Sequence, residues 1–144
     1  MNTLVRENRS GASNGEREEE QFIAPAATVL ENADGYGLTA ALMQWFFDNY
    51  ADPDVRDDPR IAPLRASDLS GLPPAIVISA EFDPLRDEGE AYAEALRVNA
   101  TPTVLRRVPG LIHGFINMTS VNRAARDATL EIASMARAAL ALRA

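Results

Sequence analysis

The chain has 144 residues, of which 47% are hydrophobic and 24% charged, as is typical of a single globular domain. Its net charge of −7 argues against binding to nucleic acid or to an anionic membrane surface, because both require a basic patch. The sequence has no cysteine and one histidine, which excludes disulfides, thiolate metal sites, cysteine nucleophiles and zinc motifs that need two histidines.

The first 23 residues are polar and acidic, with four glutamates gathered between Glu16 and Glu20. Such a segment has too little apolar surface to offset the entropy of ordering, so we predict a mobile tail over 1–23 and a folded domain over 24–144. The sequence contains no apolar signal core and no run near the ~20 apolar residues that span a bilayer. A cytoplasmic protein without a membrane span is therefore expected.

The first predicted element of the domain is a helix over about 39–50, with Thr39 as its N-cap. Leu42, Phe46 and Tyr50 recur at a spacing of four and predict one apolar stripe along that helix. A connection rich in proline and aspartate follows. Its aspartates do not match the spacing of a calcium-binding loop, so we predict a solvated turn and no metal site.

The next segment predicts a strand, a helix and a second strand. The apolar run AIVISA at 75–80 is typical of a strand buried on both faces of a parallel sheet. A helix is predicted over about 84–98, with Asp83 as N-cap, and a second parallel strand over about 102–108, ended by a Pro-Gly pair. This order predicts a right-handed βαβ unit.

The last predicted element is an amphipathic helix over about 121–142. Its apolar positions alternate steps of three and four residues along the chain, as in a helix with one buried face. These positions are Val121, Ala125, Ala128, Ile132, Met135 and Ala139. The fold class expected from all these elements is α/β.

Two polar residues fall where the two predicted parallel strands end. Asp83 follows the first strand and His113 follows the second. Neighbouring parallel strands lie ~5 Å apart, so residues that follow their carboxyl ends can meet. A carboxylate on one ring nitrogen would leave the other free to take a proton from a nucleophile. On the residues alone two further interpretations stay open: Asp83 only caps a helix, and His113 only packs between its apolar neighbours.

Longer motifs carry a family resemblance. "DLSGLPPAIVISAEFDPLRDEGEAYAEAL" followed by "PGLIHGF", with "ENADGYGLT" and "DPRIAPL" upstream, resembles the carboxyl-terminal part of the hormone-sensitive-lipase-like esterases. This resemblance implies the carboxyl-terminal part of an α/β-hydrolase fold and a carboxylic ester hydrolase acting on a small-molecule ester. It implies that Asp83 is the acid and His113 the base of a Ser-His-Asp triad. It assigns Asp87 to supporting the helix start, and it implies no metal and no organic cofactor.

Two parts of that family pattern are missing from the sequence. No H-G-G-G loop is present to form an oxyanion hole, and no G-D-S-A-G nucleophile elbow follows an apolar strand. Gly11-Ala12-Ser13-Asn14-Gly15 matches G-x-S-x-G and precedes the acid and the base in the right order. However, polar residues precede Gly11 and acidic residues follow Gly15, where an elbow needs a buried strand and a packed helix. We therefore predict that Ser13 is not a nucleophile.

The sequence thus supports two functional interpretations. In the first, the chain supplies the acid and the base of an ester hydrolase but is catalytically incomplete by itself. In the second, it is a truncated, non-catalytic remnant or a module that folds onto a partner. In the esterases that the chain resembles, the last strand and helix often form a dimer contact, which implies that the predicted strand over 102–108 and the last helix, over 121–142, are the surfaces of a homodimer.

Overall fold

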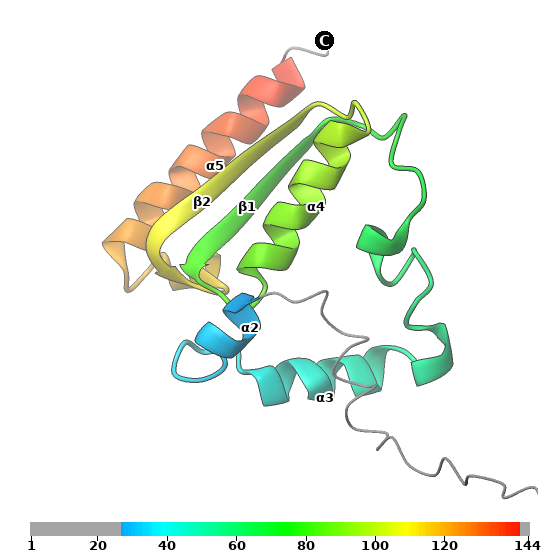
Figure 1. The fold of residues 1–144 in the computed structure, drawn as a ribbon. Coiled ribbons are helices and arrows are strands. Elements are labelled where there is room, and N and C mark those ends of the chain that lie inside the picture. The colour runs from blue at the N-terminus through cyan, green and yellow to red at the C-terminus, as the bar shows by residue number, and fades with distance from the viewer. Residues whose placement is uncertain (1–26, 142–144) are drawn as a thin grey trace, which may run out of the picture.

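The structure, a computed structural model, describes residues 27–141 and contains a two-stranded parallel sheet with helices on both sides (Figure 1). Strand β1 spans Ala75–Phe82, helix α4 spans Arg86–Val98 and strand β2 spans Thr103–Ile112. The predicted α/β class, with two parallel strands joined by a helix, is confirmed. The predicted tail over 1–23, with Ser13, lies outside the described residues.

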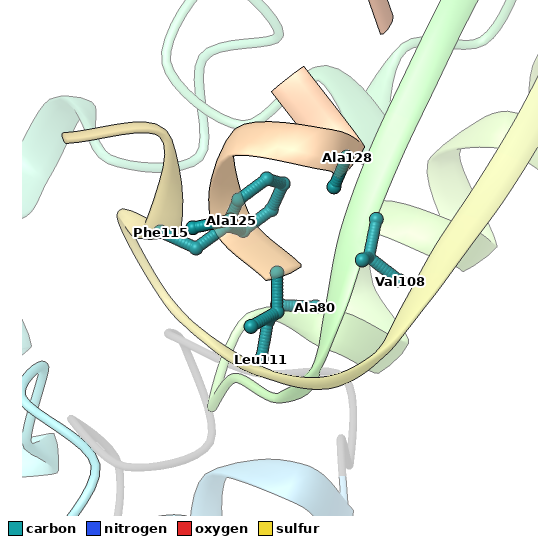
Figure 2. Packing of buried hydrophobic residues seen from close by; sticks show 6 residues of the cluster. All are labelled: Ala80, Val108, Leu111, Phe115, Ala125 and Ala128. Atoms are coloured by element: carbon teal, nitrogen blue, oxygen red, sulfur yellow. The ribbon is translucent and has the colours of Figure 1, made fainter. Parts of the chain in front are cut away.

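The sheet is covered by α4 on one face and by helix α5, Arg123–Ala141, on the other (Figure 1). Ser79 and Arg107 both reach Glu90 of α4. The alternate strand residues instead join the α5 side chains in one core cluster, because successive side chains point to opposite faces (Figure 2). Its buried members are Ala80, Val108, Leu111, Phe115, Ala125 and Ala128.

Both strands are longer than predicted. The Pro-Gly pair that was expected to end β2 lies within an irregularity of the pairing, and both strands continue beyond it. The pairing jumps from Ala80↔Val108 to Phe82↔Ile112. Within the jump, Gly110 adopts a positive φ of 71° and its N–H donates to Glu81 Oε2 at 2.7 Å. The strands then resume their pairing. As a result they end together, at the residues that immediately precede Asp83 and His113.

The start of α4 differs from the prediction. The helix begins at Arg86, and Leu85 at its N-cap position makes no side-chain cap. Asp83 lies further upstream, where its Oδ1 accepts the Leu85 N–H at 2.8 Å. The predicted N-cap is therefore wrong in position, although the carboxylate does accept a backbone N–H before the first helical turn.

Helix α3 spans Ala40–Tyr50 and begins as predicted, since Thr39 Oγ1 accepts the Leu42 N–H at 3.1 Å. The predicted apolar stripe is not covered by the described residues, since Leu42, Phe46 and Tyr50 are 38%, 51% and 72% exposed. The helix is instead anchored by Met43. That side chain packs in a small cluster with Val29 of the short helix α2, Ala27–Glu31, which the sequence pattern did not predict.

Helix α5 begins two residues later than predicted. Ala125 and Ala128 are buried as expected, and their small side chains let the helix lie close to the strands. Val121 precedes the helix and is 85% exposed, so it does not belong to the buried face. Within residues 27–141, none of the helices combines the length and apolarity needed to cross a membrane.

We expect Leu96 to dominate the packing of α4, because its side chain is only 2% exposed. Leu96→Ala should lower the free energy of unfolding by about 2–4 kcal/mol, through lost burial and the cavity left behind. Leu130→Ala makes the same change at a side chain that is 61% exposed on α5 and should cost less than about 0.5 kcal/mol. Urea denaturation measures both, and equal losses would contradict the packing described here.

The Glu90–Arg107 ion pair gives the fold a testable pH dependence. Hydrogen bonds from Arg107 hold the pKa of Glu90 below its ordinary 4.5. A lowered folded-state pKa contributes stability that is present above the unfolded value and lost as the pH falls through the folded one. Glu90→Gln should therefore cost about 1 kcal/mol at neutral pH, and that difference should shrink as the pH falls below 4.5 and the carboxylate of Glu90 becomes protonated. Glu94→Gln, at an exposed site on the same helix, should show no such difference when urea melts are compared.

Candidate active site

The structure brings Asp83 and His113 into contact. Asp83 Oδ2 lies 2.9 Å from His113 Nδ1, and each residue directly follows the strand that presents it. The preceding residues, Phe82 and Ile112, are register partners in the sheet. The parallel pairing therefore carries the two side chains to the same edge of the sheet, the edge at which α/β folds place their ligands.

Asp83 is held from several directions. The residue is 8% exposed, and its two carboxylate oxygens have different partners: Oδ1 accepts the Leu85 N–H and Oδ2 faces the imidazole. Its backbone carbonyl accepts the Arg86 N–H at 3.1 Å and the side-chain amide of Asn32 at 3.4 Å. The carboxylate thus has little freedom to turn away from the histidine.

His113 offers its second nitrogen for chemistry. An ionised carboxylate only accepts hydrogen bonds, so the proton of a neutral imidazole is assigned to Nδ1, which faces Asp83. Nε2 then carries a lone pair that can accept a proton. The histidine side chain is 43% exposed, and within residues 27–141 no hydrogen-bond partner other than Asp83 is found for it. Such an arrangement can act chemically as a base oriented by a carboxylate.

A glycine turn directs the chain after the histidine. Gly114 adopts a φ of 70°, a left-handed conformation that favours glycine, and its carbonyl accepts the Asn117 N–H. The next residue, Phe115, enters the buried core cluster (Figure 2). His113 is therefore fixed on one side by a paired strand and on the other by a buried aromatic ring.

The loop before α3 covers the end of β1. The rings of Tyr36 and Phe82 stack with centroids 5.1 Å apart and planes 7° from parallel. The sequence pattern did not single out Tyr36, because nothing in a local pattern shows that it meets a strand so far along the chain.

Asp87 does not join the acid–base pair. Its Oδ2 accepts the backbone N–H of Thr28 at 3.3 Å, and its Oδ1 accepts from Arg86 at 3.0 Å. These contacts agree with the supporting role at the helix start that the family resemblance implied. Thr28 and Asn32, on and just after α2, were missed because their partners lie more than fifty residues away.

Two aspartates of the connection after α3 pair with arginines, Asp57 with Arg65 at 3.1 Å and Asp58 with Arg60 at 2.6 Å. Hydrogen bonds from the Arg60 side chain and backbone lower the pKa of Asp58 to about 2. Arg56, itself buried, donates to Asp48 at 2.8 Å. A search of the described residues found no cluster of three histidine, cysteine or acidic side chains able to hold a metal ion.

The acid–base contact can be tested directly, because His113 is the only histidine in the sequence. Nuclear magnetic resonance of the imidazole should show the Nδ1–H tautomer in the unmodified chain. Asp83→Asn should abolish that preference, since the amide nitrogen donates where the carboxylate accepted. Asp68→Asn is the matched control, at an exposed aspartate that accepts the Ser70 N–H. An unchanged tautomer in Asp83→Asn would contradict the contact.

Comparisons with known proteins identify the family to which the chain belongs. A family model described as the alpha/beta hydrolase fold matches residues 16–117. The chain is 46% identical over 121 residues to the carboxylic ester hydrolase LipN of Mycobacterium tuberculosis, a match covering 83% of this chain and 32% of LipN. It is 40% identical over 95 residues to an ethyl acetate hydrolase of Pseudomonas putida, covering 65% of this chain and 30% of that enzyme.

A solved structure also shows the similarity to esterases. The thermophilic carboxylesterase EstE1, cloned from a metagenomic library, matches with a TM-score of 0.76 and 38% identity over 81% of this chain and 40% of its own. The chain thus spans about a third of the length of the curated relatives it matches. The predicted resemblance to esterases is confirmed, and the chain belongs to the family of the α/β-hydrolase fold.

Proposed function

We propose that the chain belongs to a carboxylic ester hydrolase and that residues 27–141 supply the acid and the base of its Ser-His-Asp triad. The observation that carries this proposal is the 2.9 Å contact between Asp83 Oδ2 and His113 Nδ1 at the carboxyl ends of two paired strands. The relatives named as ester hydrolases support the choice of reaction.

Each residue has a defined part in the proposed reaction. His113 Nε2 takes the proton of a serine hydroxyl as the serine oxygen attacks the ester carbonyl, and Asp83 stabilises the imidazolium that forms. The imidazolium then gives this proton to the departing alcohol, which leaves an acyl-enzyme. In the second half, His113 takes a proton from water, the hydroxide attacks the acyl group, and the serine recovers its proton.

The remaining parts of the machinery belong, in this proposal, to the rest of the hydrolase domain. The chain spans 32% of LipN, and the exposed Nε2 of His113 has no hydroxyl partner within the described residues. We assign the serine and the oxyanion-hole donors to the unmatched two-thirds of that length. The proposed substrates are esters with short to medium acyl chains, and no metal or organic cofactor takes part.

A second proposed role is that of a module that docks onto a partner. Among the described residues the sheet has only two strands, so β1 and β2 each have one unpaired edge. Trp45 and Phe46 are 57% and 51% exposed on α3, which is unusual for large aromatic side chains. The edge of β2, together with α5, is the surface proposed for a homodimer.

A chimera tests the proposed reaction. The part of LipN that this chain matches would be replaced by the corresponding residues of this chain, which are 46% identical to it. The chimera should hydrolyse p-nitrophenyl esters of short acids. His113→Ala and Asp83→Asn should each lower kcat by about 10³-fold or more, because either change disables the base. Asp68→Asn, at an exposed site, should leave kcat unchanged. A folded, active chimera that tolerates the first two variants would refute the proposal.

A fluorophosphonate probe tests which part of the protein carries the nucleophile. We expect no adduct on the folded 144-residue chain when its intact mass is measured, since no serine in an elbow context is present. An adduct mapped to Ser13 and lost in His113→Ala would instead place the nucleophile in this chain and make it catalytically complete.

A further inference from the structure

We propose that Thr28 and Asn32 are positioning residues that set the Asp83 carboxylate against His113. This inference rests on the proposed function, because it assigns a purpose to the same acid–base pair. Neither residue touches the imidazole. Both act on the backbone of the turn from Asp83 to Asp87, which connects β1 to α4.

Thr28 makes three hydrogen bonds to that turn. Its hydroxyl donates to the Pro84 carbonyl at 3.2 Å and accepts the Asp87 N–H at 3.3 Å. Its own backbone N–H donates to Asp87 Oδ2 at 3.3 Å. Thr28 is 0% exposed, so removing its hydroxyl leaves the buried Pro84 carbonyl and the partly buried Asp87 N–H without this partner.

The start of α4 requires such a partner from outside the helix. The first turn of any helix has N–H groups without intrahelical acceptors, and the residue at the N-cap of α4, Leu85, has no side-chain oxygen to offer. Asp83 satisfies the Leu85 N–H, and Thr28 satisfies the Asp87 N–H. The cap is thus shared between the proposed acid and a threonine 59 positions upstream of Asp87.

Asn32 adds a contact at the proposed acid itself. Its side-chain amide donates to the backbone carbonyl of Asp83 at 3.4 Å, and the residue is only 4% exposed. Its backbone N–H donates to the Thr28 carbonyl at 2.9 Å, so the two positioning residues are linked. Val29, between them, packs in the cluster that contains Met43 and Leu85. Helix α2 is therefore anchored and can hold the turn in place.

The consequence for the site follows from the geometry. Asp83 Oδ1 is committed to the Leu85 N–H, so the position of Oδ2 depends on where the turn lies. A shift of the turn by a fraction of an ångström lengthens the contact to His113, and acid–base geometry tolerates little error. Thr28 on α2 and Asn32 just after it restrict that shift through their hydrogen bonds to Pro84, Asp87 and Asp83.

The test uses the full 144-residue chain and follows the Nδ1–H proton of its only histidine by nuclear magnetic resonance. Thr28→Val keeps the shape of the side chain and removes the hydroxyl. We expect the Nδ1–H proton to exchange with water about tenfold faster and the tautomer preference to weaken. Thr28→Ser, which keeps the hydroxyl, should restore the native behaviour.

The chain offers a matched control for loss of stability alone. Thr101 is also buried, at 3% exposed, and its hydroxyl also donates to a backbone carbonyl, that of Leu69, at 3.0 Å. It lies at the opposite end of the sheet, just before β2 begins. Thr101→Val should lower Tm as Thr28→Val does but leave the His113 signals unchanged. Equal effects of both variants on His113, or none from Thr28→Val, would overturn the proposal.

Two further variants complete the design. Asn32→Leu should speed Nδ1–H exchange by a smaller factor than Thr28→Val. If Thr28→Val does not fold, Asn32→Leu tests the positioning role by itself. A native exchange rate in Asn32→Leu would then overturn the proposal. Asp83→Asn separates this inference from the proposed function. If Asp83→Asn leaves the Nδ1–H signal native, the acid–base pair itself fails. If only Asp83→Asn changes that signal, the pair stands and the positioning role is wrong.

Discussion

The resumption of strand pairing after the irregularity in β2 is the constraint on which the candidate site depends. A strand that ended at Val108, as the Pro-Gly pair predicted, would leave His113 at the tip of a free loop. Instead Ile112 pairs with Phe82, so both strands deliver their next residue to the same edge. The hydrogen bond from the Gly110 N–H to Glu81 holds the irregular stretch against β1. The Pro-Gly pair at 109–110 therefore does not end β2. The irregularity that contains it adds residues to β2, and these bring His113 level with Asp83.

The second constraint is that one carboxylate must serve both a helix and a histidine. An aspartate directly before a helix is ordinarily committed to capping, which was the simplest alternative to a catalytic role. The structure resolves the competition by giving each oxygen of Asp83 its own partner, Leu85 N–H and His113 Nδ1. The Asp87 N–H goes to Thr28. Capping and acid–base pairing are thus compatible here, because the capping work is divided between two residues.

Sequence reasoning succeeded where local periodicity or chain order decides the structure. The strand at 75–80 and the helix after it follow from local patterns and a βαβ order, and that order also indicated that Asp83 and His113 could meet. It failed where partners are distant. Helix α2 is five residues long and owes its place to contacts with α3 and α4, which no local pattern records. The stripe on α3 is a different case, because a spacing of four identifies one face of a helix but not whether a described element covers it.

Under the proposed function the described residues form one part of a site, and the position of Ser79 agrees with the nucleophile lying elsewhere. Ser79 lies on the strand that leads to Asp83, but its hydroxyl donates to Glu90 at 2.7 Å on the α4 side and cannot serve as a nucleophile for His113. Everything that orients Asp83 nevertheless comes from residues between Thr28 and His113. The contact between Asp83 and His113 is therefore set by elements within residues 28–113, and under the proposed function the rest of the hydrolase domain would bring the nucleophile and the oxyanion hole to His113 Nε2.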